Sequence, residues 1–385
     1  MISILSFLLI LFLSVSDIFF YRIGWLPAEP SVTLLPFFFI ASFSLFFKKY
    51  NLLKKKRGIN PFLYLSLISL LYLKYNVLEG GFYVLGNNLV ILFLFLTSGL
   101  FFLQADSKKV FWIFLISFFT LGGSMFYDLI YNSDLSIRGA GFAENPNSAA
   151  LRIIFLLIAI LRFVNNKKTA FLYCFIAFIF VFFTLSRSGV LVLFSIVLIL
   201  LPAKYSVLYN LKDVPLRIFK SLPILSALTL GLFNILTILP DYFPVFEHRA
   251  ALERIQQISG QGSFVSDSDI EGGRIMIMLD YLDLFLQNVF GYGTGFSMNR
   301  DFYERATHNL FLRFGIDYGI LGLLVLFWFF YYFFRKSIKN NDFYLFSLVF
   351  AAFLASFFTH SLFENRTFVL VFSFITVDIF KTKNV

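Results

Sequence analysis

The sequence predicts an all-helical, multi-pass membrane protein with about twelve spans. The first reason is composition, because 59% of the 385 residues are apolar and only 14% are charged. Soluble domains contain fewer apolar residues and a much larger share of charged ones. The second reason is that apolar runs recur along the chain, many of them near the length at which a helix crosses about 30 Å of hydrocarbon. The third reason is a segregation of lysine from arginine between alternate polar gaps.

The expected spans follow one another with short polar gaps between them. The first six are residues 2–20, 31–47, 61–73, 84–103, 110–125 and 149–163, and the next six are residues 171–185, 189–201, 222–239, 316–334, 343–359 and 368–380. Several runs are short and must borrow flanking residues to cross the bilayer. The long polar interval at 240–317 falls between the ninth and tenth spans. We therefore expect a single membrane domain over residues 1–385 that contains a long outer loop region at 240–317.

Lysine positions orient this bundle. Sixteen of the seventeen lysines lie in alternate polar gaps or in the C-terminal tail. Because basic residues are retained on the cytoplasmic side, both termini are expected in the cytoplasm. The net charge of +10 is then mainly a signal of topology, so nucleic acid is not an expected partner. The sixteen are Lys48, Lys49, Lys54, Lys55, Lys56, Lys108, Lys109, Lys167, Lys168, Lys204, Lys212, Lys220, Lys336, Lys339, Lys381 and Lys383.

Arginines gather on the opposite side, where their planar guanidinium groups can bind phosphate oxygens in bidentate fashion. Arg187 is wedged between two apolar runs with almost no loop, beside serine and glycine, which predicts a polar pocket. Arg152 lies just inside the sixth span, and snorkelling to the lipid headgroups is an equal alternative for it. The outer arginines are Arg22, Arg138, Arg152, Arg187, Arg249, Arg254, Arg274, Arg300, Arg305, Arg313 and Arg366.

Five short motifs on the predicted outer side form a recognisable series. They are Gly-Phe-Ala-Glu-Asn-Pro-Asn at 141–147, Ser-Arg-Ser-Gly at 186–189, Gly-Gly-Arg at 272–274 followed by an amphipathic run to Phe290, Gly-Tyr-Gly-Thr-Gly at 291–295, and Thr-His-Asn at 307–309. Their order over residues 139–330 resembles the bacterial O-antigen polymerase and ligase superfamily. The resemblance implies an all-helical membrane glycosyltransferase of the C type. Its donors would be glycans linked to undecaprenyl pyrophosphate, used at the periplasmic face.

The resemblance also assigns roles to residues. Arg187 and Arg274 match the family's pyrophosphate-binding arginines, and His308 matches its histidine, the expected general base for an acceptor hydroxyl. Fixed guanidinium groups can stabilise a departing pyrophosphate, so neither a metal nor another cofactor is expected. Attack opposite the pyrophosphate would invert the anomeric centre. The residues assigned to substrate binding are Asn145, Asn147, Arg152, Gly293, Arg305 and Asn309.

Several of these residues also have a plainer interpretation. Thr307 can cap a helix that begins beside His308. The positive end of that helix would keep the imidazole of His308 neutral. A histidine at a helix start is often only a polar cap. Asn145-Pro-Asn147 has the pattern of a turn before a helix. Residues 291–295 have the pattern of a tight turn, because no strand precedes them as in a phosphate-binding loop. Three polar residues share the outer end of the eleventh span without a matching motif: His360, Glu364 and Arg366.

Within the family we expect a polymerase of lipid-linked repeat units, for an O-antigen or a capsular-type polysaccharide. The alternative is a ligase that transfers the glycan to lipid A core or another acceptor. A lipid-linked glycan flippase is more distant, because it would carry charges or broken helices near mid-membrane in both halves. A peptidoglycan-type polymerase would use a loop carboxylate such as Asp267, Asp269 or Glu271.

The expected location and partners follow from this reading. The protein would lie in the bacterial inner membrane, in contact with membrane lipids, a lipid-linked glycan donor and a glycan acceptor. A polymerase would in addition have a chain-length-regulating co-polymerase as a partner.

Overall fold

The computed structural model describes residues 61–73, 78–131, 139–143, 145–184, 186–205, 274–298 and 307–382, together with Leu11 and Val15. Every regular element within these ranges is helical, as the sequence predicts. Three expected spans, 2–20, 31–47 and 222–239, lie outside the described residues apart from those two positions. The total of about twelve spans therefore stays a prediction.

The other expected spans each coincide with a helix. These helices are α5 (Pro61–Leu71), α6 (Leu78–Gln104), α7 (Ser107–Tyr131), α8 (Pro146–Leu161), α9 (Lys167–Phe183), α10 (Arg187–Tyr205), α14 (Leu310–Asn340), α15 (Phe343–Ala355) and α16 (Arg366–Thr382). Among the described residues, three stretches are long and apolar enough to cross a membrane, namely Gly80–Leu103, Ser107–Asp128 and Leu310–Asn340. Several shorter apolar helices accompany them. The chain is thus consistent with a multi-pass membrane protein.

In the described part of the chain, three helices lie outside the expected spans. The amphipathic run predicted after residue 274 is α13 (Arg274–Gln287). The other two are single turns of 3-10 helix. The turn η2 (Gly141–Ala143) lies within the motif at 141–147, and η6 (Phe296–Met298) directly follows the glycine motif at 291–295.

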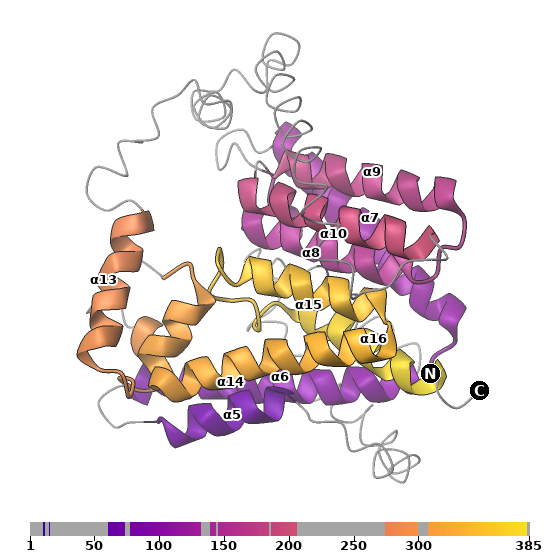
Figure 1. Ribbon diagram of the computed structural model, residues 1–385. Helices are drawn as coiled ribbons and strands as arrows, with labels where there is room; N and C mark the ends of the chain where they lie inside the picture. The colour runs from indigo at the N-terminus through magenta and orange to yellow at the C-terminus, as the bar shows by residue number, and fades with distance from the viewer. Residues whose placement is uncertain are drawn as a thin grey trace. The chain divides into compact units, whose positions relative to one another are not determined.

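The chain divides into two compact units, each of which is described by itself. Unit 1 consists of Met1–Ile113, Gly272–Lys336 and Ala352–Val385, and unit 2 of Phe114–Glu271 and Ser337–Ala351. In unit 1, α6 packs against α5 and α16, and α14 runs alongside α5 (Figure 1), where the rings of Trp328 and Tyr64 lie 5.2 Å apart between centroids.

Phenylalanine rings build the core of unit 1. The rings of Phe62 on α5 and Phe95 on α6 lie 5.0 Å apart between centroids. Phe333 on α14 and Phe372 on α16 are 4.8 Å apart with their planes nearly perpendicular. Such edge-to-face contacts add to the free energy gained from burial of the rings. Aromatic packing therefore joins four helices that come from distant parts of the sequence.

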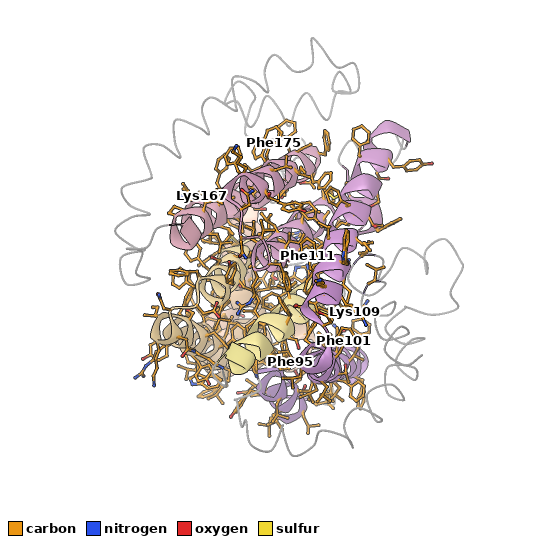
Figure 2. All side chains as sticks on the ribbon, turned by 90° about the vertical axis from the view of Figure 1, so that its right-hand side faces the viewer. Phe95, Phe101, Lys109, Phe111, Lys167 and Phe175 are labelled. Carbon is orange, nitrogen blue, oxygen red and sulfur yellow. The ribbon has the colours of Figure 1, made fainter. Side chains whose placement is uncertain are left out.

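Helix α8 is the centre of unit 2. Every side chain from Ala149 to Leu161 is buried, and α8 packs against both α9 and α10. A helix that is covered all round needs no polar face, which fits its apolar sequence. Helix α9 instead exposes Phe171 and Phe175, of which Phe175 is labelled in Figure 2. Lipid-facing positions of a membrane bundle carry such side chains.

A break in α14 shapes one end of unit 1. Gly319 has φ 63° and ψ −153°, so the helical hydrogen-bond pattern is interrupted there. The amide nitrogens of Tyr292 and Gly293 donate to the freed carbonyl oxygens of Ile316 and Asp317, at 2.8 and 3.0 Å. The glycine-rich turn at 291–295 is therefore fixed against the start of the span. A Cβ atom at Gly319 would clash with the backbone of residues 289–291, so the close approach requires glycine at that position.

Candidate functional site

The matched motifs gather at one end of each unit, which we call the motif end. In unit 2 it is the end at which α7 and α9 finish and α8 and α10 begin. In unit 1 it is the end at which α5 and α15 finish and α6, α14 and α16 begin. The positive-inside rule predicts that both motif ends face outward.

In unit 2 the motif at 141–147 builds the start of α8. Asn145 is the N-cap, and its side-chain oxygen accepts hydrogen bonds from the amides of Asn147 and Ser148, at 2.9 and 3.4 Å. Pro146 occupies the first turn, where its missing N–H costs nothing. The predicted turn and helix N-terminus are thus confirmed. The cap also occupies the Asn145 side-chain oxygen, while substrate binding by Asn145 and Asn147 stays a prediction.

The segment that leads into this cap is held by α7. One carboxylate oxygen of Asp128 accepts from the amides of Ala140 and Gly141, at 3.2 and 3.0 Å. Ser124 accepts from the amide of Phe142 at 3.1 Å. Residues 140–142 are therefore fixed against α7.

Ser186 joins the start of α8 to the start of α10. Its hydroxyl donates to the side-chain oxygen of Asn147 at 2.8 Å and accepts from the amide of Gly189 at 3.1 Å. A side chain at Gly189 would overlap Ala150, so the two helices touch closely here. Arg187 follows Ser186 and is the first residue of α10, so its backbone lies near Asn147. The polar pocket predicted for Arg187 stays a prediction, because the side chain of Arg187 lies outside the described part of the chain.

Arg152 lies on α8 in the buried part of unit 2. Only 4% of its surface is exposed. Snorkelling would place the guanidinium at the lipid headgroups. Burial inside the protein does not fit that alternative.

In unit 1 the glycine motif at 291–295 is a turn with positive φ at Gly291, Gly293 and Gly295. Thr294 ties it to α5, because its amide donates to the carbonyl of Tyr72 at 3.0 Å and its hydroxyl to that of Ser69 at 2.6 Å. Such φ values favour glycine. The interpretation as a tight turn is confirmed, and the amide of Gly293 is used within the fold rather than left open.

His308 stands immediately before α14. Its φ is 48°, a conformation that is uncommon for a residue other than glycine, and its side chain is exposed. The helix begins at Leu310, and the side-chain oxygen of Asn309 accepts from the amide of Leu312 at 3.1 Å. Asn309, and not Thr307 as the sequence suggested, is therefore the cap. Thr307 instead donates to the carbonyl of Asn309 at 3.2 Å.

A charged cluster, which no sequence motif indicated, lies next to His308. Arg313 donates from Nη1 to a carboxylate oxygen of Glu364 at 2.7 Å and to the carbonyl of His360 at 3.0 Å. Its Nε lies 4.0 Å from Asp317, which is fully buried. Asp317 also accepts from the amide of Ser297 at 2.8 Å. The cluster binds the loop after α15 and the η6 turn to the first two turns of α14.

His360 connects this cluster to His308. The two imidazole rings are 5.7 Å apart between centroids and nearly edge to face. Burial, reinforced by the nearby Arg313 charge, lowers the pKa of His360 below its ordinary value. His360 therefore stays neutral at neutral pH and packs against the exposed histidine without adding charge.

The predicted site residues fall into two sets. Asn145, Asn147, Arg152 and Arg187 belong to unit 2. Gly293, His308 and Asn309 belong to unit 1, as does Arg274, the first residue of α13. The side chains of Arg187 and Arg274, and all of Arg305, lie outside the described part of the chain. Within the described ranges, no group of three or more metal-binding side chains occurs.

Comparison with known proteins adds one finding. Residues 172–327 match the family model described as O-antigen ligase. The matched segment contains Arg187, Arg274, Gly293 and His308, whereas Asn145, Asn147 and Arg152 precede it. No curated protein matches the chain.

Proposed function

We propose that the chain is a member of the O-antigen ligase and polymerase superfamily and that it transfers a glycan from a lipid pyrophosphate carrier to an acceptor hydroxyl. The observation that carries this proposal is the match itself, because residues 172–327 include both arginines and the histidine assigned to the chemistry. The donor would be linked to undecaprenyl pyrophosphate and used at the outer face of the bacterial inner membrane. Both termini would then be cytoplasmic.

Arg187 and Arg274 are proposed to hold the donor's pyrophosphate. Each is the first residue of a helix, α10 and α13 respectively. The first turn of a helix leaves amide N–H groups without helical partners and carries partial positive charge. A guanidinium at that position and the helix end both attract an anion. Together they would stabilise the negative charge that grows on the leaving group without a metal ion.

His308 is proposed to act as the general base. It would take the proton of the acceptor hydroxyl while the oxygen attacks C1 of the donor sugar, and the C1–O bond to the pyrophosphate would break with its electron pair leaving on phosphate oxygen. Attack from the opposite side inverts the anomeric centre. The exposed side chain of His308 supports this role, because it is open to a substrate at the start of α14.

The identity of the acceptor distinguishes a ligase from a polymerase within the superfamily. The matched model is described as a ligase, which supports transfer to lipid A core or a similar acceptor better than the polymerase predicted from the sequence. We therefore propose a ligase-type reaction. A co-polymerase would be a partner only of a polymerase.

Purified protein with a defined lipid-linked repeat unit tests both points. A ligase transfers the glycan only when lipid A core is added, whereas a polymerase extends the lipid-linked chain without it. Absence of both products would contradict the proposed glycosyl transfer. In the native host, deletion of a ligase gene leaves long lipid-linked chains unattached, and deletion of a polymerase gene leaves single repeats attached.

A further inference from the structure

Helix α13 has two unlike sides. One side packs on unit 1, where Tyr281 is almost fully buried and the ring of Phe285 covers Gly315 of α14. The hydroxyl of Tyr292 donates to the carbonyl of Leu284 at 3.2 Å and ties down the end of the helix. These contacts fix which side of α13 turns away from the protein.

The outward side carries an apolar stripe next to a polar one. Leu279, Leu282 and Leu286 are spaced by three and four residues and so share one stripe, with 63% of Leu286 exposed. Asp280 and Asp283 are also exposed and lie on the adjoining stripe, which begins with the exposed Met276. The division of the exposed half into an apolar and a charged stripe is shared with helices that lie at a membrane surface, although the charges here are carboxylates and not lysine or arginine. A helix surrounded by water would have no reason to expose three leucines in line.

The position of α13 suits the same environment. Figure 1 shows α13 running crosswise to α14, beside the first residues of α14. Helix α14 is long and apolar enough to span a membrane. A helix that crosses the end of such a span lies at the depth of the bilayer interface.

Exposed apolar residues also lie where α13 leads to the span. After the helix, Phe290 is 72% exposed. The amide of Ile320, the first residue after the break in α14, donates to the carbonyl of Val289 at 2.8 Å. Ile320 and Leu321 are exposed on the span itself, where lipid is the surrounding solvent. Exposed apolar residues therefore flank the junction between α13 and the span.

We propose that α13 is an interfacial helix, with Leu279, Leu282 and Leu286 in the acyl chains of the outer leaflet and Asp280 and Asp283 in the aqueous layer. The lipid contact does not depend on the proposed reaction. One consequence does rest on it: Arg274, at the start of α13, would stand at headgroup depth, where the pyrophosphate of a membrane-bound donor also lies.

Depth-dependent fluorescence quenching tests this placement in the full chain. Cys174 is first replaced by alanine, and single cysteines at Leu282 and at the neighbouring Asp283 then carry an environment-sensitive dye in lipid nanodiscs. We expect lipids brominated on the acyl chain to quench the dye at 282 several-fold more than the dye at 283. Aqueous iodide should show the reverse order.

A second pair, Leu286 and Gln287, repeats the comparison if either first variant fails to fold. Equal quenching of the two dyes within a pair would overturn the proposal. Protection of the leucine positions from both quenchers would also overturn it, because protein, from this chain or a second copy, would then cover the stripe. Neither outcome bears on glycosyl transfer, which is measured separately.

Discussion

His308 is held in a backbone conformation that few side chains adopt, directly before the capped start of α14. If it is the general base, His308→Ala should reduce transfer by a factor of about a hundred to ten thousand. Donor binding and thermal stability should stay near those of the wild type, because the side chain is exposed. The matched control is His248→Ala, for which we expect little change. Full activity of His308→Ala in a transfer assay would rule out the assigned role.

Arg187 and Arg274 test whether geometry matters in addition to charge. Lysine keeps the positive charge but lacks the planar fork that binds two phosphate oxygens at once. Arg187→Lys and Arg274→Lys should therefore each lose most activity, with about 2 to 4 kcal/mol less stabilisation of the transition state. The comparison is kcat/KM for both variants against Arg249→Lys, which should be mild. Near-normal turnover in both variants would contradict a bidentate clamp.

His360 should make the folded protein sensitive to acid. Its pKa is lowered in the folded state by burial and by Arg313. As the pH falls below the ordinary histidine value, about 6.5, the unfolded chain binds a proton that the folded chain resists, so stability decreases. The thermal unfolding temperature in detergent should fall between about pH 7 and pH 5, and His360→Gln should reduce that fall. An unchanged pH dependence in the variant would show that His360 does not contribute.

Individual site residues could be predicted only where the sequence carries a local pattern. Turns could be predicted at Asn145-Pro-Asn147 and at the glycines of 291–295, because backbone conformation depends on nearby residues. The cluster around Arg313 brings together residues separated by about fifty positions, and no local pattern reports that contact. Its one local signal was the spacing of Arg313 and Asp317, which places opposite charges on one face of a helix.

At the scale of elements, the charged cluster around Arg313 links α14 to the loop before α16. Removing one member of a buried charged group leaves the others unpaired, at a cost of about 3 to 5 kcal/mol. Arg313→Leu should therefore lower the free energy of unfolding strongly, because it removes the positive charge beside the buried carboxylate of Asp317. Glu364→Gln should be milder, since the Glu364 side chain is 25% exposed. Arg335→Leu, an exposed position on the same helix, is the control.

Denaturant titration in detergent measures these differences. A similar loss for Arg313→Leu and Arg335→Leu would show that the cluster does not fasten the loop. If Arg313→Leu does not fold at all, Glu364→Gln still separates the alternatives. It should weaken transfer as well as stability if the loop positions His360 against His308.

Element boundaries show where hydropathy alone misleads. The tenth span was expected from residue 316, but α14 begins at Leu310. Arg313 and Asp317 made the first turns look too polar for a span, yet they are paired with each other within the helix. The break at Gly319 could not be predicted either, because a single glycine is compatible with an intact helix. Only its contact with the turn at 291–295 reveals why the helix opens there.

At the scale of the whole molecule, helical class and span positions follow from composition and run length, because the bilayer demands apolar helices of a set length. Sidedness follows from a different signal, the location of lysines. The two motif ends carry His308, Arg187 and their neighbours, while exposed Lys108, Lys109 and Lys168 begin helices at the other ends. Topology is therefore a joint prediction from charge and from the position of the motifs.

Cysteine accessibility tests this topology directly. In a background with Cys174 replaced by alanine, single cysteines at Ser133 and Ser263 should react with an impermeant thiol reagent added to intact cells. Cysteines at Lys55 and Lys339 should react only after the cells are permeabilised, because lysine-rich gaps stay in the cytoplasm. Labelling of Lys55→Cys from outside would reverse the orientation. It would also place the arginines on the cytoplasmic side, away from a donor that is used at the outer face.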